Sequence, residues 1–216
     1  MLHKLYNSNS ILNQFVAEIR DVEIQTDRLR FRKNLERIGQ ILAYEISKYL
    51  SYSKKDVETP LGIANTVLPA DRVVLATILR AGLPLHNGLL SFFDQADSAF
   101  VSAYRQHHKD GTFEVKMQYM TSPSIDDAIL IISDPMLATG ASMQQTIQAI
   151  MEFGKPKQIH IAVAIASTNG INYIKRHYPK VHLWMAAEDE ELTAKSYIVP
   201  GLGDAGDLAY GSKLQD

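Results

Sequence analysis

Residues 131–142 read Ile131-Ile132-Ser133-Asp134-Pro135-Met136-Leu137-Ala138-Thr139-Gly140-Ala141-Ser142. The apolar start predicts a buried strand that ends at Asp134, and a helix from Ser142 follows a loop of small residues. Such a loop aims several backbone N–H groups at one point, with the positive end of the helix dipole behind them. The segment therefore predicts a phosphate-binding turn, in which the Asp134 carboxylate can bond the hydroxyls of a ribose. The alternative is an ordinary strand–helix turn in which Thr139 and Ser142 only cap the helix.

The surrounding sequence predicts further buried strands. Short, continuous, β-branched apolar runs are typical of strands that are buried on both faces. These runs are Val73–Leu79, Ala128–Ile132, Ile159–Ala166 and Val181–Ala186. Helical patterns lie between them, one from Ser142 to a stop at Gly154 and another over 170–177. The alternation predicts an α/β fold with a central parallel sheet flanked by helices.

The N-terminal region predicts one long helix, over residues 28–50. Its apolar positions recur at three- and four-residue steps, at Leu35, Ile38, Leu42, Ile46 and Tyr49. Basic residues lie mostly off that stripe, at Arg28, Arg30, Arg32 and Lys33. They form either a solvated face or a contact with phosphate or another subunit. Residues 1–25 predict an arm or short helix that packs on the body or on another subunit.

One stretch interrupts the alternation. Residues 99–105 and 112–120 are both strand-like, with Lys109-Asp110-Gly111 between them. Because Asp-Gly favours a tight turn, the region 99–120 predicts an antiparallel hairpin arm that projects from the parallel sheet. The hairpin is equally compatible with a lid over a site and with a subunit contact.

Composition sets wider limits. The chain has 216 residues, a formal net charge of −2 and no cysteine. The length suits one domain spanning 1–216, and the charge argues against a broad nucleic-acid surface. The absence of cysteine excludes disulfides and thiolate metal sites. Neither a secretory signal nor a membrane span is visible, so we expect a cytoplasmic protein.

A second glycine-rich segment lies near the C-terminus and reads Tyr197-Ile198-Val199-Pro200-Gly201-Leu202-Gly203-Asp204-Ala205-Gly206-Asp207. It formally matches the dinucleotide fingerprint, but that fingerprint must open a helix inside a βαβ unit and too little chain follows. A glycine-dense loop instead lets the backbone approach a flat ligand closely. Backbone amides and carbonyls can pair with every polar group of a flat base.

A third segment, Thr77-Ile78-Leu79-Arg80-Ala81-Gly82-Leu83-Pro84, places Arg80 at the carboxyl end of a predicted strand. Open α/β sheets bind their ligands at these strand ends, and an arginine there can bind phosphate oxygens bidentately. Taken alone, a single arginine after a strand is more often a surface ion pair.

The first segment closely resembles a known loop. Asp134–Ser142, read as DPMLATGAS, is similar to the phosphoribosyl pyrophosphate (PRPP) loop of uracil phosphoribosyltransferases, a branch of the type I phosphoribosyltransferases. The resemblance implies PRPP contacts from all its residues, namely Asp134, Pro135, Met136, Leu137, Ala138, Thr139, Gly140, Ala141 and Ser142. Family members usually have a second glycine where this chain has Ala141. If that position needs a positive φ, alanine costs roughly 1 kcal/mol.

The segment from Tyr197 to Asp207 resembles the uracil-binding loop of the same family almost letter for letter. The resemblance implies backbone contacts to uracil from Ile198, Gly203, Asp204 and Ala205, within a uracil-binding hood at 187–216. It also implies that Asp204 faces the PRPP side, near the ribose and the metal. The family usually has a basic residue where this chain has Leu208, and an asparagine where it has Thr193.

The string Ile78-Leu79-Arg80-Ala81-Gly82-Leu83 also matches the family, and Tyr104-Arg105 matches its Tyr-Arg pair. The resemblance therefore implies a type I phosphoribosyltransferase fold with Arg80 and Arg105 on PRPP. The expected catalytic residues are Asp134, Arg80, Arg105 and Asp204. Mg²⁺ is the expected cofactor, arriving with PRPP and near Asp204. A homodimer or larger homo-oligomer is expected, and a GTP effector is left open.

The implied activity is the conversion of uracil and PRPP to UMP and pyrophosphate in pyrimidine salvage. Two alternatives compete with it. A phosphoribosyltransferase for a purine, orotate or cytosine would keep the PRPP loop but not the loop at 198–205. A pyrimidine regulator of the same fold that binds RNA and nucleotides would need a concentrated basic face, and the net charge of −2 is against it.

Overall fold

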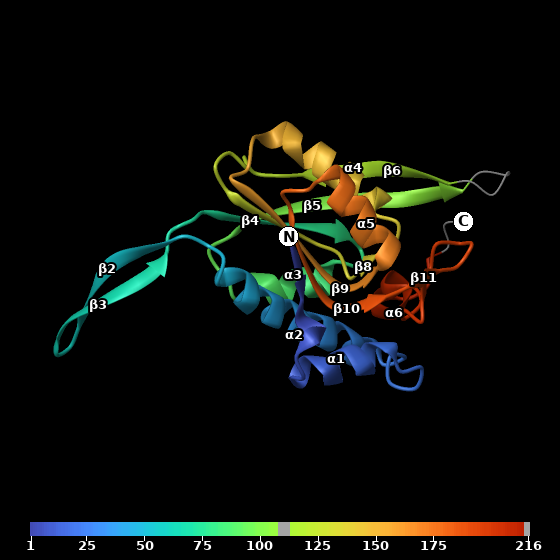
Figure 1. Cartoon of the computed structure of the whole chain (residues 1–216), viewed down its shortest axis with the longest axis horizontal. Coiled ribbons are helices and arrows are strands. Elements are labelled where there is room, and N and C mark those ends of the chain that lie inside the picture. The colour runs from blue at the N-terminus through green and yellow to red at the C-terminus, as the bar shows by residue number, and fades with distance from the viewer. Residues whose placement is uncertain (108–112, 214–216) are drawn as a thin grey trace.

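The computed structural model describes residues 1–107 and 113–213, and for 103–107 and 113–118 it describes the backbone only. Its centre is a mostly parallel sheet (Figure 1). Every neighbouring pair in this sheet is parallel except β5–β6, and the short β8 (Met136–Leu137) also pairs with β9. The strands lie in the order β1 (Leu2–Lys4), β10 (His182–Asp189), β9 (Gln158–Ser167), β7 (Ile129–Ser133), β4 (Val73–Leu79), β5 (Asp97–His107), β6 (Phe113–Thr121).

All four predicted buried strands are present as β4, β7, β9 and β10, which confirms the predicted fold class. Their continuous apolar character follows from burial on both faces. Alternate residues of β7 enter opposite cores, with Ile129 and Ile131 on one side and Leu130 and Ile132 on the other.

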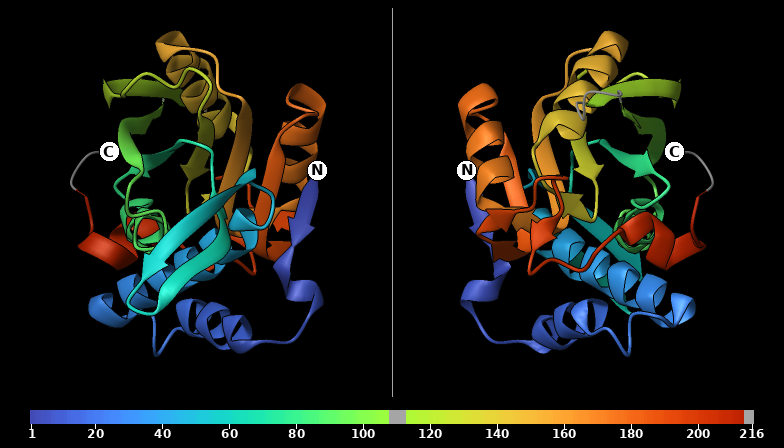
Figure 2. Two further views of the ribbon diagram at one scale, coloured as in Figure 1. Left: turned by 90° about the vertical axis from the view of Figure 1, so that its left-hand side faces the viewer. Right: turned by 90° about the vertical axis from the view of Figure 1, so that its right-hand side faces the viewer.

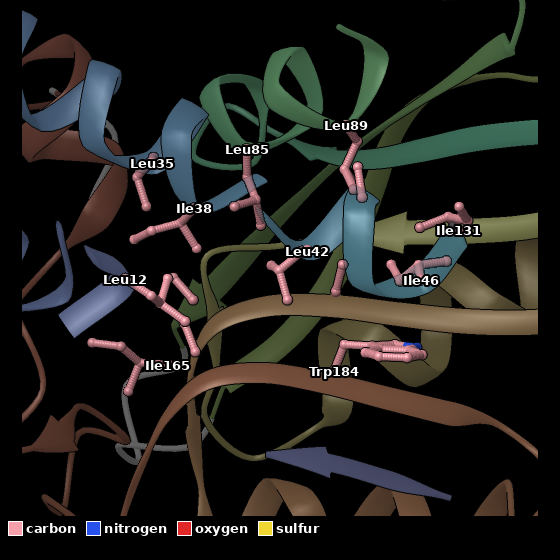
Figure 3. Close-up of a cluster of buried hydrophobic side chains, with 14 of the residues drawn as sticks. Leu12, Leu35, Ile38, Leu42, Ile46, Leu85, Leu89, Ile131, Ile165 and Trp184 are labelled. Carbon is pink, nitrogen blue, oxygen red and sulfur yellow. The ribbon is translucent and has the colours of Figure 1, made fainter. Parts of the chain in front are cut away.

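Helices cover both faces of the sheet (Figure 1). One face carries α1 (Ile11–Arg20), α2 (Arg28–Ser47) and α3 (Leu83–Leu90), and the other carries α4 (Ala141–Ile150) and α5 (Thr168–His177). In the larger core, Leu35, Ile38 and Leu42 of α2 are fully buried (Figure 3). Burial of these apolar side chains is the main stabilising term of the fold.

Helix α2 confirms the predicted long helix but ends earlier. It begins after Asp27, whose carboxylate caps the Arg30 amide, and it ends at Ser47. The prediction that Tyr49 belongs to the buried stripe is wrong, because Tyr49 lies beyond the helix and is 48% exposed. Its ring packs on those of His3 and Trp184 instead.

The basic residues of α2 make contacts within the chain. Arg30 forms an ion pair with Glu18 of α1 at 2.7 Å. Arg32 donates to the carbonyl oxygen of Ala209, in the helix α6 (Ala205–Tyr210). Figure 2 shows α6, in red, lying against α2, in blue. Two of the four basic residues therefore hold α2 to its neighbours rather than forming a purely solvated face.

The predicted hairpin is confirmed in its strands. β5 and β6 are antiparallel and extend beyond the body of the sheet, with a register shift between Ser102 and Ala103 (Figure 1). The predicted turn at Lys109-Asp110-Gly111 lies outside the described residues. Whether the hairpin is a lid or a subunit contact stays open.

A second hairpin was not predicted. β2 (Tyr52–Thr59) and β3 (Gly62–Pro69) pair along their whole length and project away from the sheet (Figure 1). Nearly all of their residues are exposed, so this part of the sequence lacks the continuous apolar runs by which the buried central strands were predicted.

The N-terminal segment packs on the body of the same chain. β1 extends the sheet beside β10 (Figure 2), the 3-10 turn η1 (Leu5–Asn7) follows, and Leu12 and Ile19 of α1 are buried. This matches one of the two predicted alternatives, and the alternative of a subunit contact stays untested. Among the described residues, no helix is both long and apolar enough to span a membrane.

Candidate active site

The predicted phosphate-binding turn follows β7 and is fastened to β9 next to it. The carbonyl oxygen of Pro135 accepts the Ile165 amide at 2.9 Å, and β8 pairs with the end of β9. The Ser167 hydroxyl donates to the carbonyl oxygen of Ala138 at 2.5 Å. A Cβ on Gly170 would lie 2.6 Å from that same oxygen, so α5 packs directly against the turn. These contacts hold the turn in one conformation before any ligand binds.

The backbone at Gly140 and Ala141 shows whether the position of the missing second glycine needs a positive φ. Gly140 has φ +86° and immediately precedes α4, and a Cβ there would lie 2.7 Å from Cδ1 of Tyr173. Ala141 is the first residue of α4, one position earlier than predicted, and its φ is not positive. Only the first of the two family glycines needs the left-handed conformation. The conformational cost considered for Ala141 is therefore absent.

A small cavity of about 70 Å³ opens at this turn. Asp134 is partly exposed, and its Oδ1 accepts the Met136 amide at 3.4 Å. Among the predicted PRPP residues of this loop, Pro135, which is buried, and Ala141 do not line the cavity. The residues that do are Asp134, Met136, Leu137, Ala138, Thr139, Gly140, Ser142 and Met143.

The loop after β4 places Arg80 beside the C-terminal loop. The Leu79–Arg80 peptide bond is cis, and the Arg80 side chain is 46% exposed. Its Nη2 lies 3.3 Å from Oδ1 of Asp207 and donates to the carbonyl oxygen of Gly211 at 3.3 Å. A Cβ on Gly82 would lie 2.2 Å from Oγ1 of Thr77, so only glycine fits this close return of the chain.

The predicted base-binding loop follows β12 (Ile198–Val199), which pairs with β11 (Glu191–Leu192). Ile198 is buried, whereas Gly203 is exposed and has φ +93°, and no atom outside residues 202–204 lies within 4 Å of the place its Cβ would occupy. The Ala205 side chain packs into the large core, so only its backbone groups are available to a ligand. The loop thus offers backbone groups and open space at Gly203, as a flat ligand requires.

Asp204 caps the short helix α6. Its Oδ1 accepts the Asp207 amide at 3.0 Å, and its Oδ2 accepts from Nζ of Lys213 at 3.2 Å. Burial raises the pKa of the Asp204 carboxyl, but bonds from the Asp207 amide, Lys213 and the Gly206 amide together hold that pKa below its usual value. Asp204 is therefore ionised at neutral pH.

The structure brings some of the predicted site residues together. A Cβ on Gly206 would lie 3.2 Å from Oδ1 of Asp204 and 3.8 Å from Nη2 of Arg80, which places the start of α6 beside the Arg80 loop. A Cβ on Gly82 would lie 3.0 Å from the carbonyl oxygen of Ser133, the residue before Asp134, so this loop also adjoins the phosphate-binding turn. The backbone of Arg105 lies in β5 opposite Val115, and its side chain is outside the described part of the chain.

The two remaining departures from the family pattern have local explanations. The Thr193 hydroxyl accepts the Tyr197 amide at 3.1 Å, so it closes the turn before the base-binding loop. Leu208 is partly buried against the large core, which replaces any contact made by a basic side chain with apolar packing.

Sequence reasoning missed several polar residues of this region. Asp207, the present partner of Arg80, belongs to the quoted C-terminal segment and could have been found there. Arg20 belongs to no quoted motif, and Asp189, which holds Gly201 together with Arg20, begins the segment up to Thr193 that resembles the family's Asp-x-x-Leu-Asn pattern but was given no role. Within the described residues, no group of three or more His, Cys, Asp or Glu side chains could hold a metal ion.

The mostly parallel sheet with helices on both faces is the fold of the type I phosphoribosyltransferases. A hypoxanthine phosphoribosyltransferase of Staphylococcus aureus shares the fold at a TM-score of 0.51, with 14% identity over 85% of this chain and 83% of that one. Similarity at this level supports the fold alone.

The particular family follows from sequence. The model of the uracil phosphoribosyltransferase family matches residues 6–212, and the chain belongs to that family. A uracil phosphoribosyltransferase of Porphyromonas gingivalis is 55% identical over 95% of this chain and 96% of its own length. One from Thermococcus gammatolerans is 37% identical over 97% and 93%. A solved protein of Aquifex aeolicus superposes with a TM-score of 0.88 at 29% identity, covering all of both chains. The predicted family and enzyme class, a pentosyltransferase, are confirmed.

Proposed function

We propose that one active site transfers a 5-phosphoribosyl group from PRPP to uracil, which yields UMP and pyrophosphate. This site is formed by the loops 80–82, 134–142 and 198–207. The observation that carries the proposal is the phosphate-binding turn. Gly140 is left-handed, α4 begins directly after it, and the cavity beside it is lined by Asp134. The N-terminus of α4 favours an anion in that cavity, such as the 5′-phosphate of PRPP.

Asp134 has two roles in this proposal. With the 5′-phosphate held at residues 139–142, the ribose extends toward the Asp134 carboxylate, which bonds its hydroxyls. The bond from C1 of the ribose to pyrophosphate then breaks through an oxocarbenium-like state, and the carboxylate stabilises the positive charge. N1 of uracil forms the new bond to C1 from the opposite face and releases its proton to water.

Uracil is bound through the backbone of the C-terminal loop. The proposed contacts come from Ile198 and from Gly203, Asp204 and Ala205, and the open space at Gly203 supports this assignment. Uracil presents alternating carbonyl and N–H groups, which backbone amides and carbonyls can match without a charged side chain. Holding N1 near C1 supplies much of the rate, because the bimolecular step becomes effectively unimolecular.

Arg80 is the proposed ligand of the departing pyrophosphate. Its present contacts to Asp207 and Gly211 are long, at 3.3 Å, and the side chain is 46% exposed, so phosphate oxygens can replace them. Arg105 is proposed for the same task from the family motif alone. The ionised Asp204 carboxylate fits a magnesium ion, which in proteins is bound by one or two carboxylates together with substrate phosphates. When bound, Mg²⁺ neutralises charge on pyrophosphate.

The role of Asp134 is tested by Asp134→Asn, with Asp127→Asn as the matched control. Asp127 is exposed before the opposite end of β7, and its φ of 54° is one that asparagine tolerates. We expect Asp134→Asn to lower kcat about 100-fold, since loss of one charge-stabilising group typically costs that much, with the KM for uracil nearly unchanged. The control should keep wild-type rates. Near-wild-type turnover in Asp134→Asn would show that this carboxylate does not act in the reaction.

The dependence on Mg²⁺, a homo-oligomeric state and a cytoplasmic location stay predictions, and the effect of GTP stays open. Omission of Mg²⁺ from an assay of pyrophosphate release is the direct test of the first. Mass measurement in solution is the test of the second.

A further inference from the structure

The N-terminal segment meets the base-binding loop at the buried carboxylate of Asp189. Asp189 ends β10 and is 6% exposed. Arg20, the last residue of α1, binds it with both ends of the guanidinium, Nη1 to Oδ2 at 2.8 Å and Nη2 to Oδ1 at 2.9 Å. The elements lie side by side in Figure 1, where α1 passes the end of β10.

The same ion pair holds both polar backbone groups of Gly201. The Gly201 amide donates to Oδ2 of Asp189 at 2.9 Å, and Nη1 of Arg20 donates to the Gly201 carbonyl oxygen at 3.0 Å. The next residue is also held from the N-terminal side, because the Gln25 side-chain amide, oriented to satisfy its neighbours, donates to the carbonyl oxygen of Leu202 at 2.9 Å. The backbone at 201–202 is thus bound by Arg20 and Gln25, which lie more than 170 positions away in the sequence, and by Asp189 at the end of β10.

Gly201 transmits this constraint to the loop on either side. It has φ +56°, and a Cβ there would lie 2.1 Å from the carbonyl oxygen of Ile198. Because the chain turns back on itself so closely, the position of Gly201 fixes the orientation of the Ile198 peptide. It also sets the point from which the exposed Gly203 extends.

A buried ion pair is weak evidence of stabilisation by itself, because desolvation offsets much of the attraction between its charges. A pair that also binds both backbone groups of one residue specifies the geometry of that residue. We infer that Arg20 is a positioning residue for uracil: through Asp189 and Gly201 it holds the 198–205 loop in the conformation that binds the base. This inference rests on the proposed assignment of that loop to uracil.

The experiment compares four variants of the full chain with the wild type, by steady-state kinetics and thermal unfolding. Arg20→Ala removes the clamp. Arg20→Lys keeps the charge but cannot bond both carboxylate oxygens in the planar fork of arginine. Arg30→Ala is the matched control, because it removes another arginine that pairs with a buried carboxylate, that of Glu18, and holds α1 to α2 without contacting the loop. Gly203→Ala probes the loop directly, where φ is +93°.

We expect Arg20→Ala to raise the KM for uracil about tenfold or more, the loss typical of a hydrogen bond to a charged group, with the KM for PRPP within about twofold. Arg20→Lys should fall between wild type and Arg20→Ala, and it keeps the inference testable if Arg20→Ala does not fold. Arg30→Ala should lower the unfolding temperature and leave the KM for uracil within about twofold. This split between two substrates is not expected from a residue that only stabilises the fold.

Three results would overturn the inference, and they differ from one another. If Arg30→Ala raises the KM for uracil as much as Arg20→Ala does, then docking of α1 and not the clamp is responsible. If Arg20→Ala leaves that KM unchanged while Gly203→Ala raises it, the loop binds uracil but Arg20 does not position it. If Gly203→Ala also leaves it unchanged, the assignment of the loop to uracil fails, and the inference fails with it.

Discussion

Replacement of Gly140 by alanine tests the phosphate-binding turn most directly. Two costs arise at this position. The backbone is left-handed at φ +86°, and the new Cβ would lie 2.7 Å from Cδ1 and 3.2 Å from Cγ of Tyr173. Rotation of the peptides around residue 140 relieves both, but it turns the loop amides away from a bound 5′-phosphate. We therefore expect Gly140→Ala to raise the KM for PRPP and to leave the KM for uracil unchanged.

The size of the effect follows from the two costs. The left-handed conformation costs an L-residue roughly 1–2 kcal/mol, which corresponds to about 5–30-fold in affinity. The contact with Tyr173 adds to this, because 2.7 Å is well inside the optimal separation of roughly 3.5–4.0 Å between carbon atoms. In the double variant Gly140→Ala/Tyr173→Ala the contact is gone, and the conformational part of about 5–30-fold should remain.

The assay is pyrophosphate release at saturating uracil as PRPP is varied, with thermal unfolding measured on the same samples. Ala141→Gly is the control, since Ala141 begins α4 without a positive φ and glycine there costs at most about 1 kcal/mol of helix stability. Its KM for PRPP should stay within about threefold. If Gly140→Ala lowers the unfolding temperature but leaves the KM for PRPP unchanged, residues 139–142 form only a structural turn, and the proposed phosphate site is wrong.

Two further outcomes are expected. Arg80→Ala should raise the KM for PRPP about tenfold or more without changing the unfolding temperature, because the exposed side chain makes only 3.3 Å contacts; an unchanged KM would remove Arg80 from the site. Burial, and secondarily the charge of nearby His182, lowers the pKa of His160 from 6.5 to about 3. Below pH 6.5 the unfolded chain therefore binds a proton at His160 that the folded chain does not bind. The contribution of this group to the free energy of unfolding is complete above pH 6.5 and falls as the pH drops toward 3. His160 alone should account for a loss of up to about 2 kcal/mol by pH 5, and the lowered pKa values of His3, His86 and His182 add to the slope seen in denaturant titration. His160→Gln should flatten that slope, and an equal slope in the variant would contradict this origin.

Much of the sheet could be predicted because burial on both faces leaves a local signal. The residues of β4 and β7 alternate between two cores, so every position except Thr77 and Ser133 is apolar and the runs are nearly continuous. The hairpin β2–β3 carries no such signal, since its residues face solvent. Helix α3 could have been predicted from Pro84, because proline is favoured in the first turn of a helix, but the sequence analysis of Thr77–Pro84 considered only the strand end that carries Arg80.

The same distinction between local and long-range signals applies to the candidate site. The candidate loops could be selected from the sequence because each follows a strand directly and carries its proposed chemistry in consecutive residues, as at Asp134 and Arg80. The contacts that hold those loops were not found, because they join distant parts of the chain. Arg20 and Asp189 are 169 positions apart, and the Ser167 hydroxyl that binds the Ala138 carbonyl belongs to another strand. No local pattern records such a pairing.

Arg80 and Arg20 show what geometry adds to residue type. Each is an arginine with a carboxylate partner in the C-terminal region, and the sequence does not distinguish their tasks. Arg20 contacts Asp189 at 2.8 and 2.9 Å, and that carboxylate is 6% exposed, so a substrate cannot displace it without burying an unpaired charge. Arg80 contacts Asp207 at 3.3 Å with both side chains open to solvent, so the exchange for phosphate oxygens costs little. In the proposed mechanism the first arginine therefore holds the loop throughout the reaction, whereas the second exchanges Asp207 for substrate phosphate in each turnover.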